Sequence, residues 1–211
     1  MPDFVVDHVF ICTERGAPAA ELLVRAGLTE GIPNTHPGQG TACRRFFFSN
    51  AMLELLWLED EAEARSEQTR GTRLWERLSG GASVCPFGVI LRPAPGAEAV
   101  ACPWRAWSYK PSTMPGLELE IADCSDLSEP MWCLFRGARA RVGADLREMT
   151  RVKIGGPRWG ADSVTSEMAR RGVIGVEKRA EPVMELEFDR GGGARGVTLD
   201  FRPELPLVIR G

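Results

Sequence analysis

The side chains best suited to chemistry in this chain are a histidine and a carboxylate placed inside apolar, strand-like runs. His8 lies in the run 5–11, and Glu54 lies in 52–58, whose other members are Leu, Met and Trp. A buried carboxylate without a partner is costly, so Glu54 needs one. An imidazole nitrogen and a carboxylate oxygen suit a divalent ion such as zinc, nickel, manganese or iron. They also form a hydrogen-bonded pair, and the sequence leaves both interpretations open.

A second histidine, His36, lies in the loop 34–41, Asn-Thr-His-Pro-Gly-Gln-Gly-Thr. Its two glycines allow the backbone to take positive φ and to approach a ligand closely. We expect His36 to act as a general acid and base at the mouth of a cavity. The alternative is a turn that orders a hairpin and leaves His36 in solvent. Arg44 and Arg45 follow, and strand alternation sends them to opposite faces. We expect Arg44 to anchor an anionic substrate group.

These residues belong to a strand–helix–strand pattern that occurs twice, in 5–59 and in 150–202. In the first copy a strand-like run is followed by helical spacing over 17–26 and then by Gly27. In the second copy, helical spacing over 162–171 is followed by Gly172. Glycine is the usual residue just beyond a helix, and further strand-like runs follow in both copies. The sequence therefore predicts a repeated structural unit.

The repeat allows positions of the last unit to be matched with the candidate functional residues of the first unit. Glu54 and Asp200 are 146 positions apart, nearly the offset of 145 between the two helix-ending glycines. Asp200 is therefore the expected third metal ligand. The position that matches His8 falls near Arg151 in the last unit and near 87–88 in the middle of the chain, and neither binds a cation in the usual way. A basic side chain favours an anionic ligand group, so we expect Arg151 to bind substrate.

Between the two copies the chain contains a charged segment and an irregular one. Residues 61–78 alternate acids and bases with apolar residues at helical spacing, which predicts a connecting helix. Strand-like runs then occupy 86–91, 104–109, 117–121 and 131–135, and a helix is nearly absent. Trp104 and Trp107 lie in the irregular region 103–111, between Pro103 and Pro111. We expect them to form a substrate-binding wall, although aromatic residues on strands more often belong to a core.

Composition narrows the functional classes. The chain has 211 residues, 44% of them hydrophobic, and a formal net charge of −3 without a basic block. These features disfavour nucleic acid and membrane partners and favour a cytoplasmic protein. The six cysteines are dispersed without a C-x-x-C pair, which argues against a structural zinc site and predicts reduced, buried thiols. No phosphate-binding loop, dinucleotide fingerprint or serine nucleophile motif occurs.

Three motifs carry a resemblance to a known family: Val-Asp-His-Val at 6–9, His-Pro-Gly-Gln-Gly-Thr at 36–41 and Leu-Glu-Leu-Leu at 53–56. They are similar to the start of glyoxalase-like proteins of the vicinal oxygen chelate superfamily. The resemblance covers residues 4–60 and is looser in 103–111, 129–130 and 202–206. It implies paired βαβββ modules whose two curled sheets enclose a cavity, often with a divalent metal held by side chains of the first and fourth strand of each module.

We therefore expect an α+β fold of repeated βαβββ modules whose curled mixed sheets enclose a cavity. Module 1 covers 1–60, the connecting helix 61–80, an irregular β-rich module 81–140 and the last module 141–211, all in one interlocked domain. The expected function is binding of a small organic molecule, anionic or neutral, in the sheet-lined cavity, and the sequence leaves open whether the protein also catalyses a reaction. The alternative is a metal-dependent lyase, isomerase or dioxygenase in which His8, Glu54 and Asp200 hold the ion and His36 moves protons. A homodimer is a compatible assembly.

Overall fold

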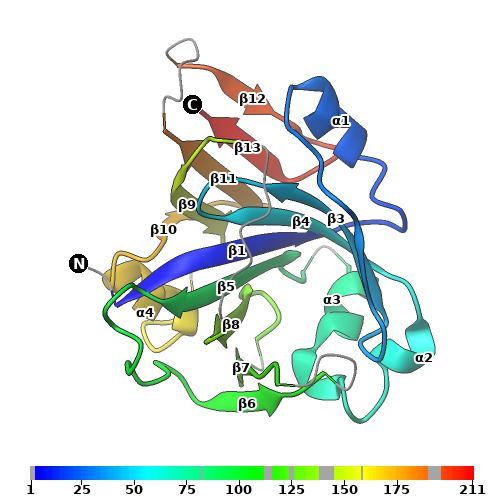
Figure 1. Ribbon diagram of the computed structural model, residues 1–211, viewed down its shortest axis with the longest axis vertical. Helices are drawn as coiled ribbons and strands as arrows, with labels where there is room; N and C mark the ends of the chain where they lie inside the picture. Colours follow the sequence, from blue (N-terminus) through cyan, green and yellow to red (C-terminus); the bar gives the residue numbers. More distant parts are fainter. Residues whose placement is uncertain are drawn as a thin grey trace.

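A computed structural model describes residues 3–81, 83–111, 116–123, 126–137, 145–157, 159–189 and 196–211. Within these residues the chain forms two mixed sheets with short helices around them (Figure 1). The first sheet contains β1 (Phe4–Cys12), β2 (Asn34–His36), β3 (Thr41–Phe47), β4 (Met52–Leu58), β5 (Phe87–Pro93), β6 (Ala106–Tyr109), β7 (Leu119–Ala122) and β8 (Met131–Phe135). The second contains β9 (Met149–Gly156), β10 (Gly175–Lys178), β11 (Val183–Phe188), β12 (Thr198–Asp200) and β13 (Leu207–Arg210). The helical segments are α1 (Ala20–Arg25), α2 (Glu61–Ala64), η1 (Arg70–Thr72), α3 (Leu74–Ser79) and α4 (Val164–Arg170).

The first sheet consists of two halves with the same connectivity. Its order is β2-β3-β4-β1-β5-β8-β7-β6, with β1 parallel to β4 and β5 parallel to β8. The two halves join through the antiparallel pair β1 and β5. The middle segment is therefore the one that completes the sheet with the first unit, and its strands lie close to the predicted runs. The expected α+β fold with a curled mixed sheet is confirmed.

The last segment forms a sheet of its own, in the order β10-β9-β11-β13-β12. It has the expected succession of strand, helix and strands, but its strands pair differently from those of the first unit. The strand after helix α4, β10, lies parallel to β9, whereas the strand after α1, β2, pairs with β3. The first strand of this unit therefore has β10 and β11 as neighbours, where β1 has β4 and β5.

Both predicted helix-ending glycines take the left-handed conformation, with φ of +88° at Gly27 and +71° at Gly172. The following residue then closes the helix, because Leu28 N donates to Leu23 O and Val173 N donates to Met168 O, each at 3.0 Å. This is the hydrogen-bond pattern of a glycine-terminated helix. The helix-terminating role of both glycines is confirmed.

The charged segment 61–78 does not form the single helix that its spacing predicts. It forms α2, η1 and α3, and these are separated by turns. Arg73, between η1 and α3, has a φ of +55°, which an α-helix does not accommodate. Asp60 caps α2 by accepting a hydrogen bond from Glu63 N. The segment therefore lies as short turns against the open side of the curled sheet rather than as a rod (Figure 1).

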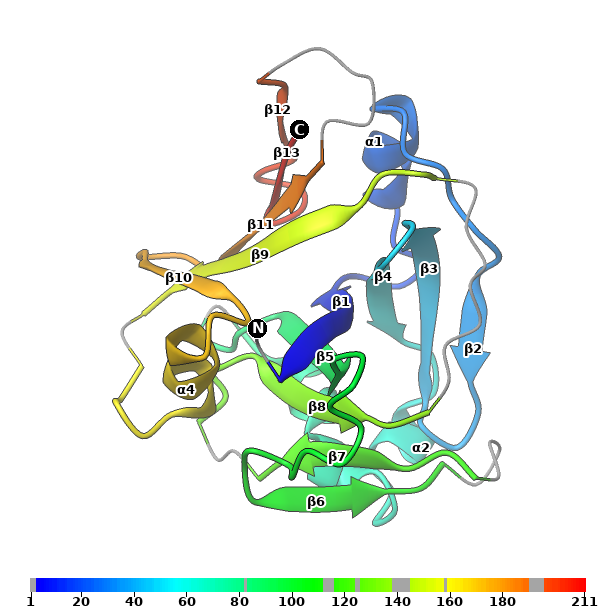
Figure 2. The ribbon, with the colours of Figure 1, turned by 60° about the vertical axis from the view of Figure 1, so that its left-hand side comes forward.

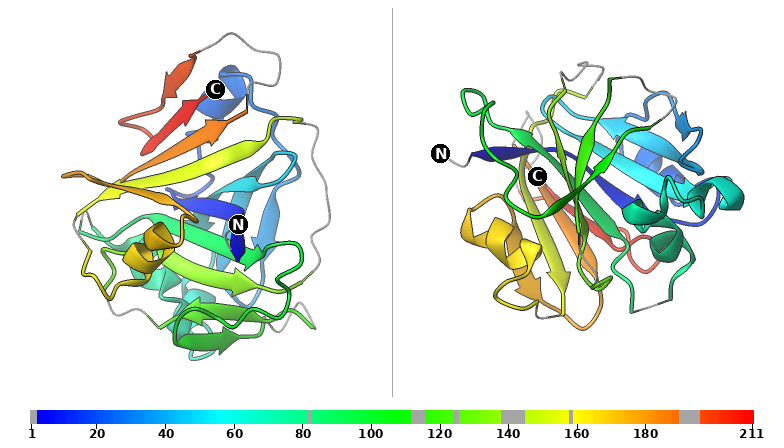
Figure 3. Two further views of the ribbon diagram at one scale, coloured as in Figure 1. Left: turned by 90° about the vertical axis from the view of Figure 1, so that its left-hand side faces the viewer. Right: turned by 90° about the horizontal axis from the view of Figure 1, so that it is seen from below.

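The two faces of the first sheet have different roles. Its convex face packs against the second sheet, α1 and α4 in one apolar core that includes Ile11, Leu55, Trp132, Ile154 and Leu186. Figure 2 and the left panel of Figure 3 show the second sheet lying across β1 on this side. The concave face carries a second apolar cluster and faces away from the second sheet. In the described part of the chain, no helix is long and apolar enough to cross a membrane.

Candidate functional site

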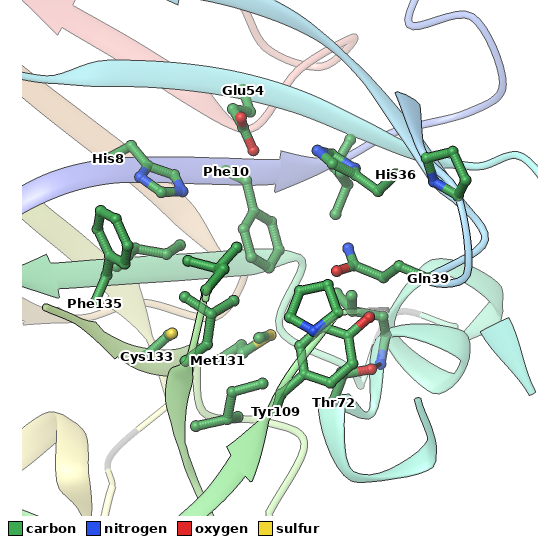
Figure 4. Close-up of a pocket in the computed structure, with 18 residues that line it drawn as sticks. His8, Phe10, His36, Gln39, Glu54, Thr72, Tyr109, Met131, Cys133 and Phe135 are labelled. Carbon is green, nitrogen blue, oxygen red and sulfur yellow. Dashed lines mark hydrogen bonds between the residues drawn. The ribbon is translucent and has the colours of Figure 1, made fainter. Parts of the chain in front are cut away.

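The concave face of the first sheet encloses a cavity of about 220 Å³. Its wall is mainly apolar, and its polar groups come from β1, β2, β4, β6, β8 and the loops beside them (Figure 4). The polar and sulfur-bearing lining residues are His8, His36, Gln39, Glu54, Thr72, Tyr109, Met131 and Cys133. The apolar wall includes Phe10, Leu56, Leu74, Ile90, Leu119, Ile121 and Phe135. Three of the predicted functional residues, His8, His36 and Glu54, are thus brought to one cavity.

His8 is oriented by the residue that precedes it. The pairing register of β1 with β5 shifts between Val6 and His8, at Asp7, which lets neighbouring side chains approach one another. Asp7 Oδ1 lies 2.7 Å from His8 Nδ1, and Asp7 Oδ2 lies 3.5 Å from Arg92 Nε. A carboxylate on Nδ1 fixes the ring and leaves Nε2 for another partner. His8 is therefore a positioned imidazole on the cavity wall, and its observed partner is Asp7.

A second group of polar atoms converges from three neighbouring strands. One nitrogen of His36, the thiol sulfur of Cys43 and one carboxylate oxygen of Glu54 all lie within 4.8 Å of one another. Cys43 is fully buried and Glu54 is 8% exposed. Thr41 Oγ1 lies 3.0 Å from His36 Nδ1 and also accepts a hydrogen bond from Gln39 Nε2 at 2.8 Å. Imidazole, thiolate and carboxylate are all ligands of transition metals, so this group can hold a metal ion.

Burial shifts the pKa values of His36, Cys43 and Tyr109 toward their uncharged forms. Desolvation lowers the pKa of His36; Glu54 opposes this effect, while Arg45 and His8 add to it. Burial raises the pKa of the Cys43 thiol, and the Glu54 carboxylate raises it further. Burial likewise raises the pKa of Tyr109. The cavity therefore presents a neutral imidazole and a phenol to a ligand, beside a thiol just behind the wall.

The middle segment supplies no second imidazole. In β1 and β4, His8 pairs with Met52 and Phe10 with Glu54; in β5 and β8, Gly88 pairs with Met131 and Ile90 with Cys133. Matching the two parallel pairs puts Gly88 at the place of His8 and Cys133 at the place of Glu54. A side chain at 88 would overlap the ring of Phe10. The cavity is therefore asymmetric, with its nitrogen ligands on one half only.

The predicted metal set His8, Glu54 and Asp200 is not assembled. Asp200 lies on β12 in the second sheet, where its carboxylate accepts hydrogen bonds from Arg202. The Arg202 guanidinium and backbone amide lower the pKa of Asp200 to about 2. The prediction of Asp200 as a third ligand, which came from the sequence offset, is wrong because the last segment forms a separate sheet. The strands of that sheet do not face the cavity.

The two predicted anion anchors also lie away from the cavity. Arg44 lies on the opposite face of β3, where its guanidinium Nε donates to Glu30 at 2.6 Å and NH2 donates to Glu21 at 2.8 Å. The Glu30 carboxylate is the main reason that the pKa of Arg44 is raised. Arg151 is exposed on β9 of the second sheet. Neither side chain lines the cavity, so the expectation of an anionic ligand loses the residues on which it was based.

The two predicted tryptophans support the cavity without lining it. Trp104 packs against Trp132, with ring centroids 6.3 Å apart, and its Nε1 donates to Glu120 O at 3.3 Å. Trp107 stacks on Tyr109 at 5.6 Å between centroids and closely covers Gly71. These two side chains therefore act as packing residues, and the prediction that they form a substrate-binding wall is wrong.

Sequence reasoning missed Gln39, Tyr109 and Cys43. Gln39 lies in the same glycine-containing loop as His36, so the loop itself was the signal for it. Tyr109 is the last residue of β6 and the only tyrosine of the chain, which could have drawn attention to it. Cys43 has no sequence signal, because its closeness to His36 and Glu54 depends on the register of three strands.

No known protein-family profile matches the sequence, and no curated protein matches it. Among solved structures, the chain is similar to a hypothetical protein from Staphylococcus aureus, with a TM-score of 0.57 and 9% identity over 98% of each chain. A hypothetical protein from Bacillus halodurans aligns with 65% of this chain and 96% of its own length, at a TM-score of 0.39 and 12% identity. The likeness to the staphylococcal protein extends over both sheets. The chain thus has an α+β fold with a strongly curled mixed sheet that a solved structure shares.

Proposed function

We propose that this protein is a glyoxalase-like member of the vicinal oxygen chelate superfamily that binds a small organic molecule on the concave face of its first sheet. One observation carries the proposal: the cavity between β1, β4, β5 and β8 is apolar on most of its wall and polar at His8, His36 and Glu54. Binding sites for small molecules have this composition, with a few polar groups that fix orientation.

The size and charge of the cavity define the ligand class. A volume of about 220 Å³ lies between the roughly 150 Å³ that holds benzene and the roughly 300 Å³ of the smallest common ligand pockets. No lysine or arginine is among the described lining residues, whereas Glu54 is. The ligand is therefore a single ring or a short chain without a negative charge, and one oxygen or nitrogen group on it meets the histidines and Glu54.

The test is binding of uncharged monocyclic aromatic and short aliphatic compounds, measured by ligand-observed NMR and by the rise in melting temperature that binding to the folded state causes. Ile90→Trp, which fills the cavity from β5, is expected to abolish binding. Val176→Trp, at a side chain 43% exposed on the second sheet, is the matched control and is expected to leave binding unchanged. Binding that is the same in the wild type and Ile90→Trp would overturn the proposal.

A metal-dependent lyase, isomerase or dioxygenase is the second candidate, and the convergence of His36, Cys43 and Glu54 favours it. A bound ion would polarise an oxygen of the substrate. In this candidate His36 is a ligand rather than a proton carrier. His8, held by Asp7 at 2.7 Å, then takes the proton from the substrate at Nε2. If this candidate is right, His8→Gln is expected to lose turnover and to retain ligand binding.

A further inference from the structure

The residues at the centre of this inference occupy one face of three adjacent strands. Across β2 and β3, His36 pairs with Thr41; across β3 and β4, Glu54 pairs with Arg45. Cys43 lies two residues from each of these β3 partners, so it is the diagonal neighbour of both His36 and Glu54. Residues two apart on a strand share a face, and diagonal neighbours across strands are within reach of each other. The strand register thus forces the three side chains to one point.

The spacing of the three ligand atoms fits one small ion. Tetrahedral zinc has bonds of about 2.0 to 2.3 Å, which places neighbouring ligands about 3.5 Å apart. The nitrogen, sulfur and oxygen atoms of the cluster lie within 4.8 Å of one another. Small side-chain rotations close that difference. The backbone is already fixed by the ladders of β2, β3 and β4.

The cluster contains a buried charge that needs compensation. Glu54 is 8% exposed, and none of the ion pairs found among the described residues includes it. Its cross-strand partner Arg45 donates from Nε to Ile32 O at 2.8 Å instead. A carboxylate in such surroundings is stable with a cation against it. His36 already has Thr41 Oγ1 at 3.0 Å from Nδ1. A hydrogen-bonding partner on one ring nitrogen is the usual support for a histidine that binds metal through the other.

We propose that His36, Cys43 and Glu54 bind a zinc-type transition metal ion whose fourth coordination position opens into the cavity. The mixed sulfur, nitrogen and oxygen set selects zinc or cobalt over magnesium and calcium, which prefer oxygen ligands. His36 and Glu54 both line the cavity, so an oxygen or nitrogen group of a ligand there would reach the open position. The site differs from the expected set in using Cys43 and in leaving out His8 and Asp200. It builds on the proposed cavity function by adding a metal to it.

Cobalt(II) reports directly on the sulfur ligand. The full-length protein, treated with chelator and kept reduced, is titrated with cobalt(II) while the near-ultraviolet and visible spectra are recorded. We expect one cobalt per chain, a sulfur-to-cobalt charge-transfer band and the intense visible bands of four-coordinate cobalt, all removed by added zinc. Failure of the wild type to develop the charge-transfer band at stoichiometric cobalt would overturn the proposal.

Matched variants assign the ligands. Cys43→Ser is expected to remove the charge-transfer band and to weaken cobalt binding at least tenfold. Cys133→Ser changes another buried thiol, one that lines the same cavity, and is expected to keep the band. His8→Ala is expected to keep it and His36→Ala to weaken binding. A band that survives Cys43→Ser, or that disappears in Cys133→Ser, contradicts the assignment.

A measurement on the wild type guards against variants that do not fold. X-ray absorption of the zinc-loaded protein is expected to show one sulfur at about 2.3 Å and nitrogen or oxygen ligands at about 2.0 to 2.1 Å. A shell without sulfur would overturn the proposal even if the Cys43 variant were unstable. Ligand binding to the metal-free protein is measured separately with the Ile90→Trp pair. Loss of the metal site and loss of the cavity function are therefore distinguishable outcomes.

Discussion

At the scale of single residues, the cavity wall depends on the close contact between Gly88 and the aromatic ring of Phe10. Gly88 on β5 lies directly beneath the Phe10 ring on β1, and a Cβ at 88 would overlap that ring. The place that could have held a second metal ligand is therefore occupied by an aromatic side chain. This arrangement explains why both histidines and the carboxylate of the cavity come from the first half of the sheet.

Gly88→Ala is predicted to destabilise the protein by about 1–3 kcal/mol, because overpacking forces the Phe10 ring or the backbone to move. In the Phe10→Leu background the same substitution is expected to cost less, by at least about 0.5 kcal/mol, since the two side chains are in contact. The four members of this cycle are compared by urea denaturation. Additive effects would contradict the overlap of Phe10 with residue 88.

Glu185 is the second residue with unusual surroundings, and it lies on the outer face of the second sheet. Its side chain is 3% exposed and forms three ion pairs. The Glu185 carboxylate oxygens lie 3.3 Å from Lys153 Nζ and 3.1 Å from both Arg179 NH2 and Arg210 Nε. Burial alone would raise the pKa of Glu185, but hydrogen bonds from Arg210 and Lys153 outweigh it and lower the pKa. The carboxylate thus ties β9, β11 and β13 to the residue that follows β10.

Glu185→Gln is predicted to cost about 1–3 kcal/mol at neutral pH, through the loss of hydrogen bonds between charged groups. Because the folded pKa is lowered, the stabilisation is full above the unfolded value of 4.5 and disappears as pH falls through the folded value. The free energies of unfolding of the wild type and Glu185→Gln should therefore become similar as pH falls. Urea denaturation of both proteins from pH 7 to pH 3 measures this. Glu187→Gln, on the same strand, is the control, with an expected change below about 0.5 kcal/mol. A difference that grows in acid would refute the assignment.

At the scale of elements, the turn between β3 and β4 joins the two sheets. Asn50 Nδ2 donates to Met149 O, and Met149 N donates to Asn50 Oδ1, each at 2.9 Å. Ser49 N donates to Arg147 O at 3.0 Å. The side-chain amide of Asn50 thus forms, with the first residue of β9, the two hydrogen bonds that a neighbouring strand would otherwise form. The second sheet is therefore docked by specific hydrogen bonds as well as by apolar packing.

Asn50→Ala is predicted to destabilise the protein by about 1–3 kcal/mol, because the backbone N–H and C=O of Met149 both lose their partner. Ser49→Ala removes only the hydroxyl bond to Arg147 O and leaves the backbone bond to the same atom. It is expected to cost less than about 1 kcal/mol. Urea denaturation ranks the two variants, and hydrogen exchange at Met149 should accelerate in Asn50→Ala alone. Equal losses would argue against the docking role of Asn50.

At the scale of the whole molecule, the second sheet covers the convex face of the first. Residues of both sheets contribute to one apolar core, among them Val9, Leu53 and Val89 from the first and Val152 and Met184 from the second. The cavity lies on the other face of the first sheet and is built without any residue of β9 to β13. The second sheet therefore supports the site from behind.

A chain that ends at residue 137 is predicted to lose solubility although it contains every described residue of the cavity. Its convex face would present contiguous apolar side chains of β1, β4, β5 and β8 to water, and such patches lead to association. Size-exclusion chromatography and binding of an apolar fluorescent dye compare it with the full chain. A monomeric, cooperatively unfolding product would show that the second sheet is dispensable.

The sequence by itself determined most of the local elements and part of the site, although it did not indicate that 61–78 breaks into short turns. Apolar runs bounded by turn residues marked most of the strands, glycine marked the ends of α1 and α4, and Glu54 stood out because a carboxylate in an apolar strand requires a partner. His8 and His36 were identified by residue type and loop chemistry, and both line the cavity. These signals are local, so they can be read along the chain.

Only the tertiary structure decided which strands became neighbours. The nearly equal offset of Glu54 and Asp200 predicted a shared site, yet Asp200 lies on β12 of a separate sheet and forms an ion pair with Arg202. Alternation put Arg44 and Arg45 on opposite faces of β3 without saying which face was concave. The approach of Cys43 to His36 and Glu54 depends on the registers of β2, β3 and β4. Strand order and register are set by long-range packing, and no single segment of the sequence contains that information.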